Sequence, residues 1–347
     1  MKKVVIGMSG GVDSSVAALL LQKQGYEVIG ITFKFIDEFD ASDAKRICDK
    51  LNIKHYIVDY KKQFKEQIID KFLEDYKSGI TPNPCVLCNK LFKINFLYEE
   101  MKKLGADYIA TGHYAKIEDG KLFKSIDKNK DQTYFLSQVS HEQLSHLLLP
   151  LEGIEKSIVR EIAKENGFFN AEKKDSLDVC FITNSFKDYI REKINNKPGK
   201  IIDIDTNKVL ATHEGLSFYT IGQRKGLNIG GTSDKTFVVG KDLEKNILYI
   251  CIGENNKHLI STECLIENIN YLRKEKITKC TAKFRYRQSD LPVEIEWLDN
   301  NQAIVRYKEG IKAGTPGQAC VFYLGNQCLG GGIIKEVRKN KNKLWYL

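Results

Sequence analysis

The loop of residues 7–15 is the first segment whose residue types could carry out chemistry. Its sequence, Gly-Met-Ser-Gly-Gly-Val-Asp-Ser-Ser, combines a flexible backbone with three hydroxyl groups and one carboxylate. Glycines let a backbone turn tightly and approach a ligand, and the N–H groups at the start of a following helix attract an anion. No Gly-Lys-Ser or Gly-Lys-Thr follows, so this is not the phosphate loop of kinases and GTPases. The loop predicts a phosphate-binding turn; the alternative is a glycine-rich turn in which Asp or Ser caps a helix.

Three cysteines form the second candidate set. Cys85 and Cys88 are separated by two residues and follow a proline-stiffened segment, whereas Cys180 lies much later in the chain. We expect Cys88 near the N-terminus of a helix, where the helix dipole lowers the pKa of a thiol. A structural zinc site is the alternative for the cysteine pair, but no second Cys-x-x-Cys or His-x-x-x-His follows at zinc-finger spacing. Cys180 considered alone is typical of a buried core cysteine.

Alternating strands and helices are expected to position the loop. The residue pattern predicts strands over 3–7, 27–33, 54–59 and 107–111, and helices over 14–24, 43–51, 64–77 and 89–104. This alternation is typical of a doubly wound parallel sheet, in which ligands bind outside the carboxyl ends of the strands. Helices are also expected over 143–149, 156–166 and 186–193.

The character of the chain changes after Pro198 and Gly199. Short alternating segments punctuated by Gly, Asn and Asp favour β structure from there to the end. We therefore predict an α/β class with three parts: a nucleotide-binding domain (residues 1–196), a small central β-rich domain (197–260) and a C-terminal β-barrel (261–347).

Composition limits the kind of protein. The 347 residues include 54 Lys and Arg against 45 Asp and Glu, a net charge of +9. No apolar run approaches the 18 or so residues of a membrane helix, and the N-terminus leads directly into a strand rather than a signal peptide. Nine cysteines at irregular spacing do not form a disulfide scaffold. We expect a cytoplasmic protein with reduced cysteines and no membrane association.

Basic residues gather late in the chain. Residues 273–287 hold seven basic side chains against one acidic, with Tyr286 among them, and residues 335–343 hold five against one. Such runs are often solvated faces, but beside a phosphate-binding domain they also suit an RNA surface.

Two resemblances follow from these segments. Residues 9–14 (SGGVDS) match the pyrophosphate-binding loop, SGGxDS, of the ATP pyrophosphatases, which adenylate a substrate oxygen. The whole chain resembles the tRNA-specific 2-thiouridylases, which place sulfur on C2 of the wobble uridine (position 34) of tRNA. The matching segments are 9–14, 81–90, 110–114, 130–136, 174–182, 218–226, 284–288, 315–318 and 330–332.

The resemblance implies a role for individual residues. It implies ATP contacts at Gly7, Met8, Ser9, Gly10, Gly11, Val12, Asp13, Ser14, Phe33 and Gly112, target-base contacts at Asn83, Pro84 and Cys85, and tRNA contacts at Lys130, Asp131, Gln132, Arg285 and Tyr286. Cys180 would carry a persulfide and Cys88 would be the nucleophile that closes a transient disulfide with it. His113 is assigned no catalytic role. ATP and Mg²⁺ are the implied cofactors, and tRNA and a sulfur-donor protein (a cysteine desulfurase or a relay protein) the implied partners.

This sequence departs from the family at Cys85, where many members have Asp. Three thiols with an open fourth position could instead hold a [4Fe–4S] cluster through Cys85, Cys88 and Cys180. Two further alternatives are an ATP pyrophosphatase that amidates a small molecule and an RNA-binding protein that uses nucleotide only as a switch.

Overall fold

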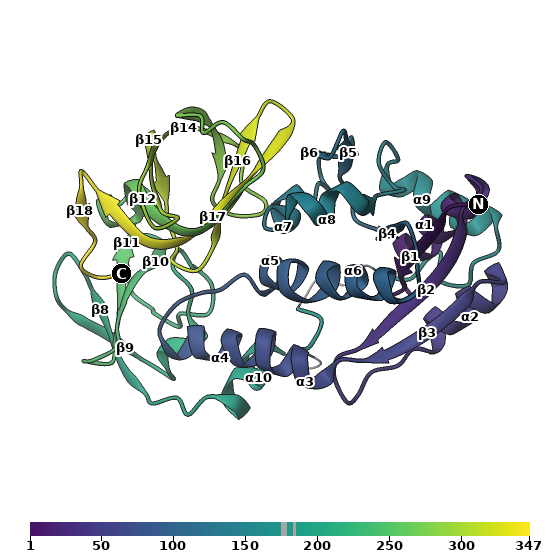
Figure 1. Ribbon diagram of the computed structural model, residues 1–347. Helices are drawn as coiled ribbons and strands as arrows, with labels where there is room; N and C mark the ends of the chain where they lie inside the picture. Colours follow the sequence, from purple (N-terminus) through teal and green to yellow (C-terminus); the bar gives the residue numbers. More distant parts are fainter. Residues whose placement is uncertain (175–178, 183–184) are drawn as a thin grey trace.

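The computed structural model describes residues 1–174, 179–182 and 185–347 (Figure 1). Residues 175–178, part of the segment 174–182 that supports the resemblance, lie outside this range. The α/β part occupies one end of the molecule, and the two β parts occupy the other. The N-terminus lies in the α/β part and the C-terminus among the β parts.

The α/β part is built on a parallel sheet with the strand order β3-β2-β1-β4-β7. The strands of this sheet are β1 (Lys3–Gly7), β2 (Glu27–Lys34), β3 (Lys54–Asp59), β4 (Tyr108–Ala110) and β7 (Leu147–Leu148). The helical segments are α1 (Val12–Lys23), α2 (Ser42–Leu51), α3 (Lys61–Phe64), η1 (Lys65–Ile69), α4 (Asp70–Lys77), α5 (Pro84–Cys88), η2 (Asn89–Lys93), α6 (Ile94–Lys103), α7 (Thr133–Leu136), α8 (His141–His146), α9 (Lys156–Glu165) and α10 (Phe186–Lys193).

Helices cover both faces of this sheet because successive side chains of a strand point to opposite sides. Val4 and Ile6 pack in one core cluster with residues of α1, α2 and α9, whereas Val5 packs in another with residues of α6. These strand residues are fully buried. The near-continuous apolar runs of the strands therefore reflect a sheet that is buried on both faces.

Three differences between the sequence-based elements and the structure are larger than a shift of a few residues at an end. The predicted helix 89–104 begins earlier, at Pro84, so that Cys85 and Cys88 lie in its first turns. The predicted helix 143–149 ends at His146, because Leu147 and Leu148 pair with β4 as a sheet strand. The hairpin of β5 (Lys116–Glu118) and β6 (Lys121–Phe123) was not expected.

The central part is a sheet with the order β10-β11-β8-β9. Its strands are β8 (Gly199–Asp203), β9 (Val209–His213), β10 (Thr236–Asp242) and β11 (Ile247–Ile252), with the short helix η3 (Leu216–Phe218) between β9 and β10 and η4 (Lys257–Leu259) after β11. Strands β8 and β11 are parallel, and the other pairs are antiparallel.

The C-terminal part is a closed barrel, since β12 pairs with both β15 and β17. Its strands are β12 (Ile260–Tyr271), β13 (Lys279–Lys283), β14 (Leu291–Trp297), β15 (Ala303–Lys312), β16 (Ala319–Leu324) and β17 (Gln327–Lys339), with β18 (Asn342–Lys343) paired to β17. The hairpin β5–β6 extends the barrel sheet, because β6 pairs with β17. The fold class predicted from the sequence is confirmed. Among the residues that the structure describes, no helix combines the length and apolar character needed to cross a membrane.

Candidate functional site

The loop after β1 is a tight cradle at the carboxyl end of the sheet. The Met8 N–H donates to the carbonyl of Ile31 at 2.7 Å, which ties the loop to β2. Ser9 N–H donates to Ser14 Oγ at 3.3 Å, and the Ser14 hydroxyl donates to the Gly11 carbonyl at 3.1 Å. Helix α1 begins directly after Gly11, so the amino end of its dipole points into this turn. The cradle can therefore hold an anion.

Glycine is required at two positions of this cradle. Gly10 has φ +74°, and a Cβ there would lie 2.8 Å from Cβ of Asp43. A Cβ at Gly112, just after β4, would lie 2.8 Å from the backbone carbon of Asp13. The loop and the β4 end thus touch backbone to backbone, which places Gly112 beside the predicted ATP residues.

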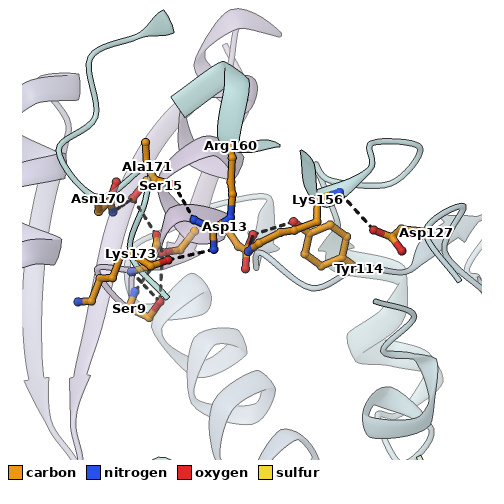
Figure 2. Close-up of polar contacts among 12 residues, drawn as sticks. Ser9, Asp13, Ser15, Tyr114, Asp127, Lys156, Arg160, Asn170, Ala171 and Lys173 are labelled. Carbon is orange, nitrogen blue, oxygen red and sulfur yellow. Dashed lines mark hydrogen bonds and ion pairs between the residues drawn. The ribbon is translucent and has the colours of Figure 1, made fainter. Parts of the chain in front are cut away.

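Asp13, in the first turn of α1, is the carboxylate of the cradle (Figure 2). Its Oδ1 accepts from the Tyr114 hydroxyl at 2.7 Å and from Lys156 Nζ at 2.6 Å. A single carboxylate beside a phosphate cradle fits Mg²⁺, which proteins commonly hold through one or two carboxylates together with phosphate oxygens and water.

A second wall of the cradle comes from the residues after α9. Asn170 is buried, and its Nδ2 donates to the Gly10 carbonyl and to Ser15 Oγ, each at 3.0 Å. Arg160 donates to the carbonyls of Ala171 and Lys173 at 2.6 and 3.0 Å. These contacts position residues 170–173 against the phosphate loop, as Figure 2 shows.

Phe33 and His113 lie close to this region but are enclosed by protein. Phe33 is 9% exposed and packs edge-on against Tyr60 and Phe92. Burial lowers the pKa of His113 to about 3, and its Nδ1 lies 2.8 Å from the Thr111 hydroxyl. His113 is therefore neutral, in keeping with its having no assigned acid–base role. The ATP contact of Phe33 stays a prediction.

The cysteine helix α5 begins at a capped turn. Asn83 Oδ1 accepts from the Val86 N–H at 3.3 Å, and Pro84 occupies the first helical position, where its missing N–H costs nothing. Cys85 is exposed and Cys88 is half-buried. The segment before the helix is held by the barrel, because Gln318 Nε2 donates to the Thr81 carbonyl at 2.8 Å.

The three predicted functional thiols lie in one electrostatic environment. Burial first, and the Cys180 and Cys85 thiolates after it, raise the pKa of Cys88 to about 12. Loss of hydration beside the surrounding protein is the main cause that also raises the pKa values of Cys85 and Cys180, although both residues keep exposed surface. Lys93 opposes the shift at each thiol. Mutual repulsion of this kind requires proximity, so the fold brings Cys180 to the cysteine helix across more than 90 positions of sequence.

Two sequence-based expectations for these cysteines are wrong. Cys88 was expected to have a lowered pKa, but loss of hydration outweighs the helix dipole, which acts only over the first turn. Cys180 considered alone was expected in the core, yet it is exposed. In the described ranges, no group of three or more His, Cys, Asp or Glu side chains is arranged to hold a metal ion. The iron–sulfur cluster on these thiols stays a prediction.

The predicted tRNA residues of the α/β part are engaged with the protein itself. Asp131 is 5% exposed and accepts from the Thr133 hydroxyl at 2.8 Å. Gln132 Oε1 accepts from the Tyr114 N–H at 2.9 Å, while Lys130 is half-buried beside it. Their direct contact with tRNA stays a prediction.

Arg285 and Tyr286 follow β13 and face inward in part. Arg285 Nη2 donates to the carbonyls of Ile221 and Ala313 and to the Thr315 hydroxyl, at 2.8, 2.9 and 2.6 Å. Burial lowers the pKa of Arg285. Tyr286 packs against Phe135 with ring centroids 4.3 Å apart and the ring planes tilted by 41°. Arg285 therefore joins the central part to the barrel, and its predicted contact with tRNA remains to be tested.

Sequence reasoning did not single out several residues that the structure places at the site. They are Lys93, Lys156, Arg160, Asn170 and Gln318. Gln318 belonged to a segment that supported the resemblance, and Lys156 and Arg160 are four residues apart on one predicted helix. No local signal indicated which distant segment they would meet.

The fold and its cradle define a class, a nucleotide-binding α/β domain joined to two β domains. Residues 2–184 match the family described as tRNA methyl transferase HUP domain, residues 187–252 the tRNA methyl transferase PRC-barrel domain, and residues 261–334 the Aminomethyltransferase beta-barrel domain.

Full-length relatives narrow this class. The tRNA-specific 2-thiouridylase MnmA of Lysinibacillus sphaericus (strain C3-41) is 47% identical over 364 residues, covering 99% of this chain and 97% of the relative. The protein of the same name from Bacillus subtilis (strain 168) is also 47% identical, covering 99% of this chain and 98% of the relative. The chain belongs to the tRNA-specific 2-thiouridylase family.

Matches to solved structures are partial. A 4-thiouridine synthetase–RNA complex with bound ATP is 22% identical, with a TM-score of 0.35, covering 55% of this chain and 50% of that one. At this TM-score the match says nothing about function.

Proposed function

We propose that this protein is an ATP-dependent tRNA 2-thiouridylase that adenylates the C2 oxygen of the wobble uridine (position 34) and then replaces that oxygen with sulfur. The observation that carries the proposal is 47% identity along the whole chain to proteins named tRNA-specific 2-thiouridylase. The phosphate cradle and the grouped thiols supply the two chemistries that this reaction needs.

The first step is adenylation at the loop after β1. The C2 oxygen of uridine attacks the α-phosphorus of ATP, an O–P bond forms, and the bond to the β-phosphate breaks so that pyrophosphate leaves with the electron pair. The backbone N–H groups at the start of α1 and the Ser9 and Ser14 hydroxyls would stabilise this charge. Mg²⁺, held by Asp13 and the phosphates, would supply further charge neutralisation.

The second step is sulfur transfer at the thiols. Cys180 would carry a persulfide whose terminal sulfur attacks C2, and AMP would leave with the former C2 oxygen. Attack of the Cys88 thiolate on the Cys180 sulfur would then release the thiolated uridine and leave a Cys88–Cys180 disulfide. A reductant must reduce this disulfide, and a sulfur-donor protein (a cysteine desulfurase or a relay protein) must renew the persulfide. Reduced thiols, ATP and tRNA together favour the cytoplasm as its location.

A direct assay tests the proposal. The protein is incubated with ATP, Mg²⁺, unmodified tRNA, a thiol reductant and a cysteine desulfurase with cysteine as the source of sulfane sulfur, and AMP and 2-thiouridine are quantified. Both products should form. Cys88→Ser and Cys180→Ser should each stop thiolation, and only Cys180→Ser should abolish persulfide labelling, because a serine hydroxyl cannot carry sulfane sulfur. Persulfide on another cysteine, with Cys180 unlabelled, would overturn the assignment.

The alternatives considered from the sequence are not favoured. Amidation of a small molecule leaves the full-length thiouridylase relatives and the grouped thiols unexplained. A cluster on Cys85, Cys88 and Cys180 is tested by anaerobic purification and by Cys85→Asp. We expect a colourless protein and a Cys85→Asp variant that still thiolates tRNA in air; a brown protein that loses its iron on this substitution would establish the cluster instead.

A further inference from the structure

Lys156 is an ammonium buried in the wall of the phosphate cradle. It is the first residue of α9, and its side chain is 10% exposed. Its Nζ lies 2.6 Å from Asp13 Oδ1, while its N–H donates to Asp127 Oδ2 at 3.2 Å. Burying an ion pair costs hydration energy that the mutual attraction often fails to recover. The Asp13 side chain is 32% exposed, so the pair opens towards the cradle. A buried ammonium in this position is better explained by ligand binding than by stability.

The direction of the side chain supports this explanation. Helix α9 packs on α1, and residues four apart lie on one face of a helix. Lys156 and Arg160 accordingly both run from α9 towards the loop, as Figure 2 shows. Arg160 is committed to the carbonyls of Ala171 and Lys173. Lys156 instead meets a carboxylate in the first turn of α1, beside the N–H groups that would hold phosphate.

We propose that Lys156 is a catalytic residue of adenylation, one that moves its hydrogen bond from Asp13 to the pyrophosphate portion of ATP. This inference rests on the proposed function. Oxygens of bound pyrophosphate carry more negative charge than one carboxylate, so they compete for the ammonium, and Asp13 would then be available to hold Mg²⁺, which would supply further charge neutralisation. As the bond between the α- and β-phosphates breaks, the electron pair goes to pyrophosphate. Lys156 neutralises the charge that gathers there.

The test uses binding as well as turnover. Inorganic pyrophosphate with Mg²⁺ is titrated calorimetrically into the full-length protein and its Lys156→Met and Lys156→Arg variants, and AMP release is measured with ATP and tRNA. Loss of one positioned electrostatic contact typically lowers kcat about 100- to 1,000-fold. We expect that loss of AMP release in Lys156→Met, at least tenfold weaker pyrophosphate binding, and partial recovery in Lys156→Arg. Persulfide labelling of Cys180 and tRNA affinity should not change.

Lys164→Met is the matched control. Lys164 is on the same helix, is exposed, and pairs with Glu172 at 3.0 Å. Its loss should leave pyrophosphate binding and AMP release at the parental level.

A double variant separates phosphate contact from simple support of Asp13. If Lys156 only neutralises Asp13, Asp13→Asn/Lys156→Met should bind pyrophosphate as tightly as Asp13→Asn. If Lys156 touches phosphate, the double variant should bind at least tenfold more weakly. Equal binding, or parental binding by a folded Lys156→Met variant, overturns the proposal, as does a parent that binds no pyrophosphate. A parent that binds pyrophosphate and forms AMP but never thiouridine overturns the proposed function alone.

Discussion

At the scale of single residues, burial decides the chemistry of the thiols. Cys88 follows a capped helix start, where the dipole favours a thiolate, yet the surrounding protein raises its pKa to about 12. A neutral thiol resists unwanted oxidation of its own sulfur, since the thiolate is the reactive form. Lys93 opposes this rise at all three thiols, so its ammonium favours the thiolate forms.

This environment predicts an unusual pH dependence. An ordinary thiol with a pKa near 8.5 stops gaining reactivity above about pH 9. Cys88 is mostly protonated throughout this range, so its alkylation by iodoacetamide should rise about tenfold per pH unit from pH 7 to pH 10. The rate is followed by mass spectrometry of the Cys88 peptide. A plateau at pH 9 would contradict the raised pKa.

Lys93 gives a companion prediction. Lys93→Gln should slow alkylation of Cys88 and Cys180 severalfold at constant pH, because removal of the ammonium raises both pKa values further. Lys102→Gln, an exposed lysine further along the same helical run, serves as the control. Equal rates in all three proteins would show that Lys93 does not act on the thiols.

At the scale of elements, the segment after α9 positions the phosphate loop through a contact with its backbone. Asn170 holds the Gly10 carbonyl and so sets the orientation of the peptide whose N–H belongs to Gly11. A peptide group has its C=O and N–H on opposite sides. Bonding the carbonyl to the wall therefore turns the N–H towards the cradle.

Asn170→Ala should weaken ATP binding indirectly, because Asn170 orients the loop and does not itself contact the nucleotide. Loss of the bonds to Gly10 and Ser15 costs about 1 kcal/mol, or about fivefold in affinity, and this should appear as a higher KM for ATP with tRNA affinity unchanged. Asn166→Ala removes a similar amide that caps Ile162 at the end of α9, and its KM should remain parental. If both variants keep the parental KM, Asn170 does not orient the loop.

Two arginines in the segment after β13 have different surroundings. Arg285 bonds to Ile221, Ala313 and Thr315, whereas Arg287 is exposed. Arg285→Ala should lower the free energy of unfolding by about 2 kcal/mol. Arg287→Ala should instead weaken tRNA binding and reduce its salt dependence by about one counterion. Denaturant unfolding and binding titrations at several salt concentrations distinguish them; a stable Arg285→Ala variant with the salt defect would show that Arg285 contacts phosphate.

At the scale of the whole molecule, the barrel and the α/β part share structure. Strand β6 pairs with β17, and Tyr134 donates to the Ala319 carbonyl at 3.0 Å. One core cluster contains residues of the α/β part, the central sheet and the barrel. Lys124 pairs with Asp290, and Lys283 lies 3.8 Å from Asp290 and from Asp131. The charge cluster thus joins the two ends of the molecule.

This continuity predicts cooperative unfolding. The parent should unfold in one calorimetric transition, because one core cluster and the pairing of β6 with β17 run across the parts. Asp290→Ala leaves two lysines without a shared carboxylate and should destabilise the protein by about 3 kcal/mol. Asp299→Ala, at an exposed turn of the barrel, is the control and should leave the free energy of unfolding unchanged. Separate transitions for the α/β part and the barrel in the parent would refute this coupling.

The sequence by itself determined what depends on neighbouring residues. The loop 7–15, the strands that frame it and the cap before Cys85 are contiguous patterns whose geometry follows from local backbone preferences. Tertiary structure alone decided which distant side chains complete the site: Lys156 reaches Asp13 across 143 positions and Asn170 reaches Gly10 across 160. It also turned Arg285 inward and raised the thiol pKa values. Such outcomes depend on desolvation and on partners remote in sequence, and no local pattern encodes either one.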